Sequence, residues 1–382
     1  MKNKVLTGLL LVLIGGWGSL LAQNAGSNYA RQVNTLIGTK GVGLTSGYLY
    51  PGATYPYGMV QFTPSYFSKR SGFVINQLSG GGCEHMGNFP TFPVKGKLKM
   101  SPDNILNYRI NISEEKGHAG YYEAKVQEDI HAKLTVTERT GMASYEYPAD
   151  QQYGTVIIGG GISATPIDQA AIVITAPNKC EGYAEGGNFC GLRTPYKVYF
   201  VAEFDTDALE SGTWRRDELK PNTTFAEGEY SGVYFTFDVN KKKNIQYKIG
   251  VSYVSVENAR ENLKAENTGW DFLQIQNQAE SKWNHYLGKI EVEGTNPDRT
   301  TQFYTHLYRS FIHPNVCSDV NGEYMGADFR VHKSRSKHYT SFSNWDTYRT
   351  QIQLLSILDP EVASDIVISH QLFAEEAGGA FP

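Results

Sequence analysis

Hydrophobic and polar side chains alternate along much of the first two thirds of the chain. One run places Tyr196, Val198, Phe200, Ala202 and Phe204 opposite Lys197, Tyr199, Val201 and Glu203. A second run alternates Ile245, Tyr247, Ile249, Val251 and Tyr253. A period of two that is interrupted by Gly, Pro and Asn is typical of strands that bury one face. The pattern predicts an antiparallel β-sandwich over residues 28–256.

The hydrophobic period lengthens after Val256. Residues 257–266 are charged and helical in character, and a helical face follows at spacings of three and four residues. That face consists of Phe272, Ile275, Ala279, Trp283 and Tyr286. An extended link at 288–294 ends this part. The sequence therefore predicts a helical linker over residues 257–294.

Helical patterns dominate residues 295–382. A helix is expected from Thr301, a hairpin turn at Asn321-Gly322, a helix from Trp345 to Leu358, and a last helix that ends near Gly378-Gly379. So few helices cannot bury their own apolar faces as a layer of a stable domain. We expect residues 295–382 to be the start of an incomplete α-helical domain, either truncated or docked on something else.

The N-terminus has the features of a secretion signal. Lys2 and Lys4 precede an apolar run from Val5 to Ile14, which is too short to span a bilayer, and Ala22 ends a small-residue cleavage pattern. We expect residues 1–22 to be removed, no membrane span to remain, and the protein to be periplasmic or secreted. The net charge of −4 argues against nucleic acid and anionic membranes as partners.

Export would place the four cysteines, Cys83, Cys180, Cys190 and Cys317, in an oxidising compartment. Cys180 and Cys190 flank a glycine-rich segment that we interpret as a turn. A disulfide between them would close a short loop and contribute about 2–3 kcal/mol. Two unpaired thiols are nearly as compatible with the sequence, and no spacing resembles a zinc site.

The richest candidate chemistry lies between Ser341 and Arg349. Trp345, Asp346 and Arg349 lie within one helical turn and combine an aromatic face with two charged hydrogen-bonding groups, which is how proteins hold a sugar ring. A structural interpretation is equally good, because Ser343 followed by Asp346 is a capping-box pattern that would start the helix.

Two loops rich in Gly and Pro could also carry function. The first, Pro51–Gln61, is interpreted as a strand connection that could hold binding groups. The second, Leu78–Asn88, presents Glu84 and His85 at an edge. It lacks the Lys-Ser/Thr ending of a phosphate loop. A single histidine is more often structural than a ligand, so both roles stay open for His85.

These segments, in this order, resemble glycoside hydrolase family 92, the calcium-dependent exo-acting α-mannosidases. The matching stretches include Val33–Thr39, Pro51–Gln61, Leu78–Cys83, Gly120–Tyr122, Leu134–Arg139, Tyr199–Val201, Lys248–Ser252 and Ser343–Arg349. The resemblance implies an N-terminal β-sandwich packed on an (α/α)6 barrel, of which residues 295–382 would be the first helices. It also implies hydrolysis of terminal mannose from N-glycans or mannan, with inversion and with calcium as cofactor.

The resemblance assigns substrate contact, but not catalysis, to this chain. Asp346 and Arg349, in the turn that also holds Trp345, match the family's sugar-binding motif, and Glu84 and His85 fall where a loop shapes specificity. The general acid, the general base and the calcium ligands are expected beyond Pro382, so this chain alone is expected to be inactive.

Two other classes of protein remain as alternatives. One is a non-catalytic fragment that binds glycans or a protein partner. The other is a different sandwich-and-barrel enzyme, such as a phosphorylase or a glucoamylase, which the motifs argue against.

Overall fold

The fold is taken from a computed structural model, which describes residues 28–39, 48–65, 72–103 and 111–379. The expected signal peptide, residues 1–22, lies outside the described residues. Within the described part, no helix is long and apolar enough to cross a membrane.

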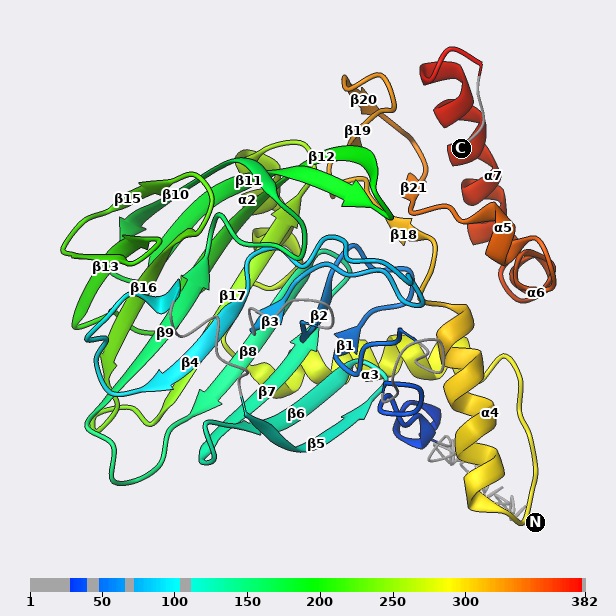
Figure 1. Cartoon of the computed structure of the whole chain (residues 1–382). Helices are drawn as coiled ribbons and strands as arrows, with labels where there is room; N and C mark the ends of the chain where they lie inside the picture. The colour runs from blue at the N-terminus through cyan, green and yellow to red at the C-terminus, as the bar shows by residue number, and fades with distance from the viewer. Residues whose placement is uncertain (1–27, 40–47, 66–71, 104–110, 380–382) are drawn as a thin grey trace, which may run out of the picture.

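Two antiparallel sheets face each other and form a sandwich, as the alternating pattern predicts (Figure 1). Within the described residues, one sheet has eight strands in the spatial order β1 (Ala53–Thr54), β2 (Gln61–Pro64), β3 (Phe73–Val74), β4 (Thr91–Lys95), β9 (Tyr153–Gly159), β16 (Ser231–Asp238), β13 (Glu210–Arg215) and β14 (Glu218–Pro221). The other has nine described strands, in the order β15 (Phe225–Glu227), β10 (Ile167–Ala176), β11 (Lys179–Phe189), β12 (Leu192–Phe204), β17 (Asn244–Ser252), β8 (Thr140–Glu146), β7 (Ile130–Val136), β6 (Tyr121–Val126) and β5 (Ile112–His118).

The predicted inward positions of the sandwich are buried. Val198, Phe200, Ala202 and Phe204 of β12 belong to the main hydrophobic core, which is shared by both sheets. On the opposite face of β12, Lys197, Tyr199 and Glu203 are half-buried, and Val201 is covered by a helix. The period of two along the sequence is therefore the direct consequence of a strand with one face in the core.

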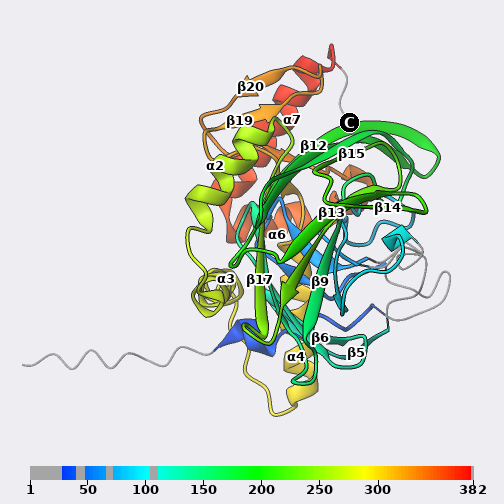
Figure 2. The ribbon, with the colours of Figure 1, turned by 90° about the vertical axis from the view of Figure 1, so that its left-hand side faces the viewer.

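Three helices come directly after the sandwich, and each of them has a side chain that caps its first turn. Helix α2 (Val256–Glu266) is capped by Ser255, α3 (Phe272–Leu287) by Asp271, and α4 (Pro297–Ser310) by Asn296. Figure 2 shows α2 along the outer side of the sheet that holds β12 and β17, where Ala259 and Leu263 pack on Val201.

The C-terminal part contains four short strands and three further helices among the described residues. They are β18 (Asn315–Val316), β19 (Glu323–Met325), β20 (Val331–Lys333), β21 (Tyr339–Thr340), α5 (Asn344–Thr347), α6 (Gln351–Leu358) and α7 (Pro360–Glu376). A second hydrophobic core joins this part to the short 3-10 helix η1 (Tyr29–Gln32) and to Tyr57 of the Pro51–Gln61 loop. In this core, Trp283 of α3 packs against Tyr308 of α4, with the ring centres 4.5 Å apart.

Two of the predicted local structures differ from the observed ones. The single helix expected from Trp345 to Leu358 is divided into α5 and α6, because Thr350 adopts a left-handed φ of +70° between them. Asn321-Gly322 does form a tight turn, in which the Gly322 amide donates to the Asp319 carbonyl. However, the hairpin strands β19 and β20 come after that turn.

Candidate functional site

The three predicted sugar-binding residues lie on one exposed surface turn. Helix α5 carries Trp345, which is 86% exposed, and Asp346, which is also exposed. Arg349 follows in the same turn, with its guanidinium 5.2 Å from the centre of the Tyr348 ring. The structure therefore brings an indole, a carboxylate and a guanidinium together at the surface.

The predicted capping box at this turn is wrong. Ser343 is the residue before α5, but its side chain accepts no hydrogen bond from the backbone of the helix. Its hydroxyl instead donates to a carboxylate oxygen of Asp346. A hydroxyl that donates to a nearby carboxylate forms a charge-assisted bond, which competes with the weaker bond to a backbone amide. Ser343 thus orients Asp346 and does not cap the helix.

Gln351 anchors the end of this turn to the chain that precedes it. The Gln351 side-chain amide donates to the backbone carbonyls of Ser310, at 3.0 Å, and His313, at 3.2 Å. The Gln353 side chain donates to the carbonyl of Tyr348 at 3.0 Å. The turn is exposed, but hydrogen bonds fix the chain on both sides of the break at Thr350, at Tyr348 before it and at Gln351 after it.

The second candidate segment, Leu78–His85, divides its two predicted residues between surface and interior. Glu84 is exposed, whereas His85 is only 2% exposed. His85 Nε2 accepts from the Leu78 amide at 2.8 Å, and His85 Nδ1 lies 2.6 Å from the Cys83 carbonyl. These partners assign the proton to Nδ1 and make the ring neutral. Burial lowers the pKa of His85, in agreement with that state.

His313 was not singled out by the sequence, yet it joins the two candidate segments. Its Nε2 accepts from the Ser79 amide at 2.8 Å, and its carbonyl accepts from Gln351. Its Nδ1 lies 2.8 Å from Asn315 Oδ1, and the Asn315 amide in turn donates to the carbonyls of Gly58 and Ile312. Burial lowers the pKa of His313 to about 4, so the ring is neutral at physiological pH.

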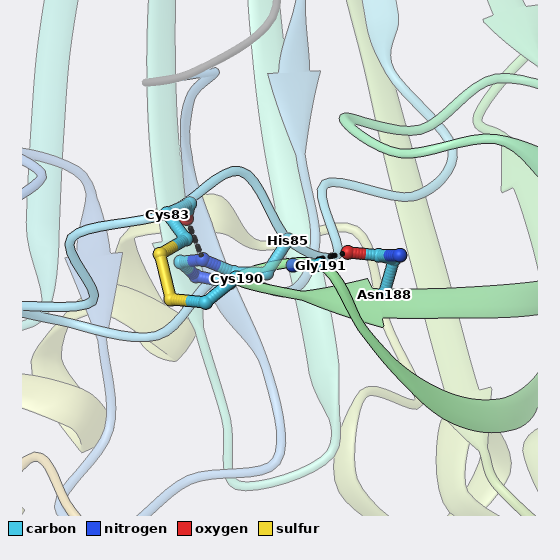
Figure 3. Close-up of a disulfide and its surroundings, with 5 residues drawn as sticks. All are labelled: Cys83, His85, Asn188, Cys190 and Gly191. Carbon is cyan, nitrogen blue, oxygen red and sulfur yellow. Dashed lines mark hydrogen bonds between the residues drawn. A yellow bond between two sulfur atoms is a disulfide. The ribbon is translucent and has the colours of Figure 1, made fainter.

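The disulfide predicted between Cys180 and Cys190 is wrong. Cys190 is bonded to Cys83, with the two Cα atoms 5.3 Å apart (Figure 3). Cys180 is a free, fully buried thiol. The segment between Cys180 and Cys190 is the strand β11, not a turn. Ten residues of extended chain span about 33 Å, far beyond the reach of a disulfide. The observed bond links the Gly-rich segment to the end of β11.

The described residues offer no metal site of the usual kind. Within that part of the chain, no three His, Cys, Asp or Glu side chains are grouped closely enough to hold a metal ion. The Leu78–His85 segment and the chain just after the Trp345 turn both form hydrogen bonds with His313.

Comparison with known proteins places this chain in a family. The N-terminal domain of glycosyl hydrolase family 92 matches residues 32–252, and the catalytic domain of the same family matches residues 258–382. The chain belongs to glycosyl hydrolase family 92. The resemblance drawn from the ordered motifs is thereby confirmed.

Three similar proteins can be compared with this chain in sequence, fold and length. A family GH92 α-mannosidase from Bacteroides thetaiotaomicron shares 25% identity and superposes with a TM-score of 0.83 over 93% of this chain and 50% of its own. An inverting GH92 mannosidase from the same species shares 24% identity, with a TM-score of 0.79 over 92% and 49%. A secreted glycosidase of Arthroderma benhamiae is 26% identical over 89% of this chain and 48% of its own length. The chain thus spans about half the length of these relatives.

Proposed function

We propose that the protein represented by this chain is an exo-acting α-mannosidase, which removes terminal mannose from N-glycans or mannan outside the cytoplasm. The observation that carries the proposal is the exposed turn of Trp345, Asp346 and Arg349 in a chain that belongs to family 92. Support also comes from the similar proteins. Two are α-mannosidases or mannosidases by name, one of these was solved with mannoimidazole, and a third is described as secreted.

The turn would hold the terminal sugar by three complementary contacts. The exposed indole of Trp345 offers an apolar face to the C–H side of a pyranose ring. Ser343 donates to one carboxylate oxygen of Asp346 and so fixes its orientation, with the second oxygen available to accept from a sugar hydroxyl. Arg349 would donate to ring hydroxyls from the same side. These groups bind and orient substrate, and none of them takes a proton during hydrolysis.

The hydrolytic step requires groups that we place outside this chain. Inversion needs one carboxylic acid to protonate the leaving oxygen and one carboxylate to activate water, about 6.5–9.5 Å apart. We propose that this pair lies in the half of the relatives' length that the chain does not match. We expect calcium to bind beside this pair, as the resemblance to family 92 implies, and to contact the hydroxyls of the terminal sugar.

The test is hydrolysis by the longest natural protein that contains this chain. We expect release of mannose from α-mannosides and α-linked mannobioses, with loss of activity in a chelator and recovery on addition of Ca²⁺. Trp345→Ala should lower kcat/KM at least tenfold, because burial of an aromatic ring against substrate is worth about 1.5–3 kcal/mol. Asp346→Asn and Arg349→Lys should each lower kcat/KM further. The first loses a charge-assisted hydrogen bond to the sugar, and the second loses the bidentate geometry of the guanidinium.

A matched control is Phe225→Ala. Phe225 is a 54% exposed aromatic residue of β15, at the far edge of the nine-stranded sheet. Its replacement should leave kcat/KM unchanged. Absence of mannose release from every α-mannoside would refute the proposal. Mannose binding without turnover would instead identify a non-catalytic glycan-binding protein.

A further inference from the structure

The Gly-rich segment Leu78–His85 has a backbone that would be mobile on its own. Gly80 has a φ of +79°, and a Cβ added at Gly80 or Gly82 would meet no atom within 4 Å. Glycine has the widest choice of backbone conformations of any residue, and these two glycines face open space. A segment of this kind can contribute to binding only if something else fixes it, because ordering it during binding would cost affinity.

Two neutral imidazoles hold the first half of the segment. The amides of Leu78 and Ser79, which are adjacent in sequence, donate to His85 and His313 respectively, both at 2.8 Å. Gly81 makes room for one of these rings, since a Cβ there would lie 2.9 Å from His85 Cε1. Each imidazole can accept only while it is neutral, and each directs its other nitrogen to an oxygen atom.

The disulfide holds the second half of the segment against a rigid partner. Cys190 lies in the turn between β11 and β12, where Phe189 pairs with Leu192. In that turn the Gly191 amide donates to the Asn188 side chain at 3.0 Å (Figure 3). The Phe189 ring also packs edge-on against His85, with the ring centres 5.7 Å apart. Cys83 is therefore tied to the end of a long hairpin, and the exposed Glu84 is the next residue.

The same attachments place the segment beside the Trp345 turn. His313 receives the Ser79 amide through its ring and the Gln351 side chain through its carbonyl, so the two candidate segments meet at one residue. Gln351 is only two residues from Arg349. A change in the position of His313 would move the Gly-rich segment relative to the sugar-binding turn.

We propose that the Cys83–Cys190 disulfide and His313 are positioning residues of the sugar site, which hold the Gly-rich segment and Glu84 in one place beside the Trp345 turn before substrate arrives. The inference rests on the proposed function and deepens it. The segment then contacts the part of the glycan that extends past the sugar held by Trp345. The free energy that it costs to order the segment is met during folding, before the glycan binds.

The expected signature is a change in KM that depends on the length of the substrate. In the full protein, Cys83→Ser with Cys190→Ser should raise KM for a mannobiose about tenfold, which corresponds to about 1.4 kcal/mol of ordering cost. KM for a small aryl mannoside, and kcat for both substrates, should change less than twofold. His313→Gln, whose side-chain oxygen can still accept from Ser79, should retain KM, whereas His313→Leu should raise it.

Arg193→Gln is the matched control. Arg193 belongs to the same hairpin, three residues after Cys190, and forms an exposed ion pair with Asp168 away from the segment. Its replacement should leave both KM values unchanged. A purely structural role for the disulfide would instead lower kcat and raise KM equally for both substrates, and that result would overturn the proposal.

A second measurement separates this proposal from the proposed function. Hydrogen exchange at the Leu78 and Ser79 amides should be slow in the native protein and at least tenfold faster in the double cysteine variant, whatever the substrate. If no α-mannoside is hydrolysed but exchange accelerates, the proposed function fails and the positioning role stands. Unchanged exchange in the double variant would overturn the positioning role, even in an active mannosidase.

Discussion

Removal of the Arg139 side chain should destabilise the junction between the sandwich and the helical part of the chain. Arg139 lies just before β8, and its residue surface is only 6% exposed. Its Nη1 donates to Glu138 at 2.6 Å and to Glu266, at the end of α2, at 2.7 Å. Its Nε donates to the Ser318 carbonyl at 2.7 Å. One guanidinium thus connects the sandwich, the linker helix and the C-terminal segment.

The magnitude follows from what Arg139→Met would leave behind. Two carboxylates whose side chains are 13% and 16% exposed would lose their shared cation, and the Ser318 carbonyl would lose a donor. Loss of one partner of a buried ion pair typically costs about 3–5 kcal/mol, largely because the remaining charge is desolvated without compensation. Because Glu138 also pairs with Lys337, we expect about 3 kcal/mol, at the low end of that range.

The assay is urea unfolding of the chain and its variants at pH 7. Arg139→Met should lower the free energy of unfolding by about 3 kcal/mol, and Arg139→Met combined with Glu266→Gln should cost less than the sum of the single changes. Arg193→Gln, which removes an exposed ion pair, should cost less than about 1 kcal/mol. A loss below 1 kcal/mol for Arg139→Met would refute the reasoning.

The pH dependence gives an independent check on the same residue. Burial would raise the pKa of Glu138, but the charges of Arg139 and Lys337 outweigh it, so the pKa is lowered in the folded protein. The stability that this shift contributes is present above the unfolded pKa of about 4.3 and is lost as the pH falls through the folded value. Without Arg139 the burial effect should dominate. The difference in stability between the native protein and Arg139→Met should therefore shrink as the pH is lowered below 5.

Three further predictions concern other parts of the chain. Burial lowers the pKa of both His313 and His338 to about 4. Each therefore contributes stability that is present above the unfolded pKa of about 6.5 and is lost as the pH falls towards 4. The urea midpoint of unfolding should fall across that pH range, and it should fall less steeply in His313→Gln. Trp283→Phe should cost about 2 kcal/mol in urea unfolding, because the fully buried indole donates to the Thr54 carbonyl at 2.7 Å and that carbonyl would be left unpaired. Cys180 should react with iodoacetamide only in denaturant, as measured by peptide mass, because burial raises the pKa of its thiol and closes access to it.

Hydrophobic periodicity predicted the sandwich because each strand has one face in a single continuous core. The same logic failed for β11, where glycines were taken as a turn signal. A Cβ at Gly182 would lie 2.2 Å from the Ala171 carbonyl of the neighbouring strand β10. Glycine is required there by the close approach of two backbones within a sheet. A glycine-rich composition cannot distinguish a strand with a close backbone neighbour from a turn. The disulfide was predicted wrongly because this strand was predicted to be a turn.

The site was only partly predictable for a different reason. Trp345, Asp346 and Arg349 are close in sequence, so their grouping on one turn could be predicted from spacing alone. The break in the helix at Thr350 could not be predicted. A left-handed φ is unfavourable for threonine, and the apolar pattern continues through α6 with no residue that indicates a break. His313 and Ser79 are 234 residues apart, and only the packing of the helical part on the sandwich brings them together.

Adjacent residues in the Gly-rich segment show why sequence spacing alone could not assign their roles. Glu84 and His85 suggested one shared role, since both are polar residues beside a flexible loop. In the structure His85 points inward and accepts from the loop's own backbone, while Glu84 remains at the surface. The two roles depend on each other, because a glycine-rich backbone can present a side chain in a fixed position only if neighbouring groups restrain it. The free energy of ordering the loop is then met when the protein folds and its disulfide forms, and under the proposed function it would not reduce the affinity for a glycan.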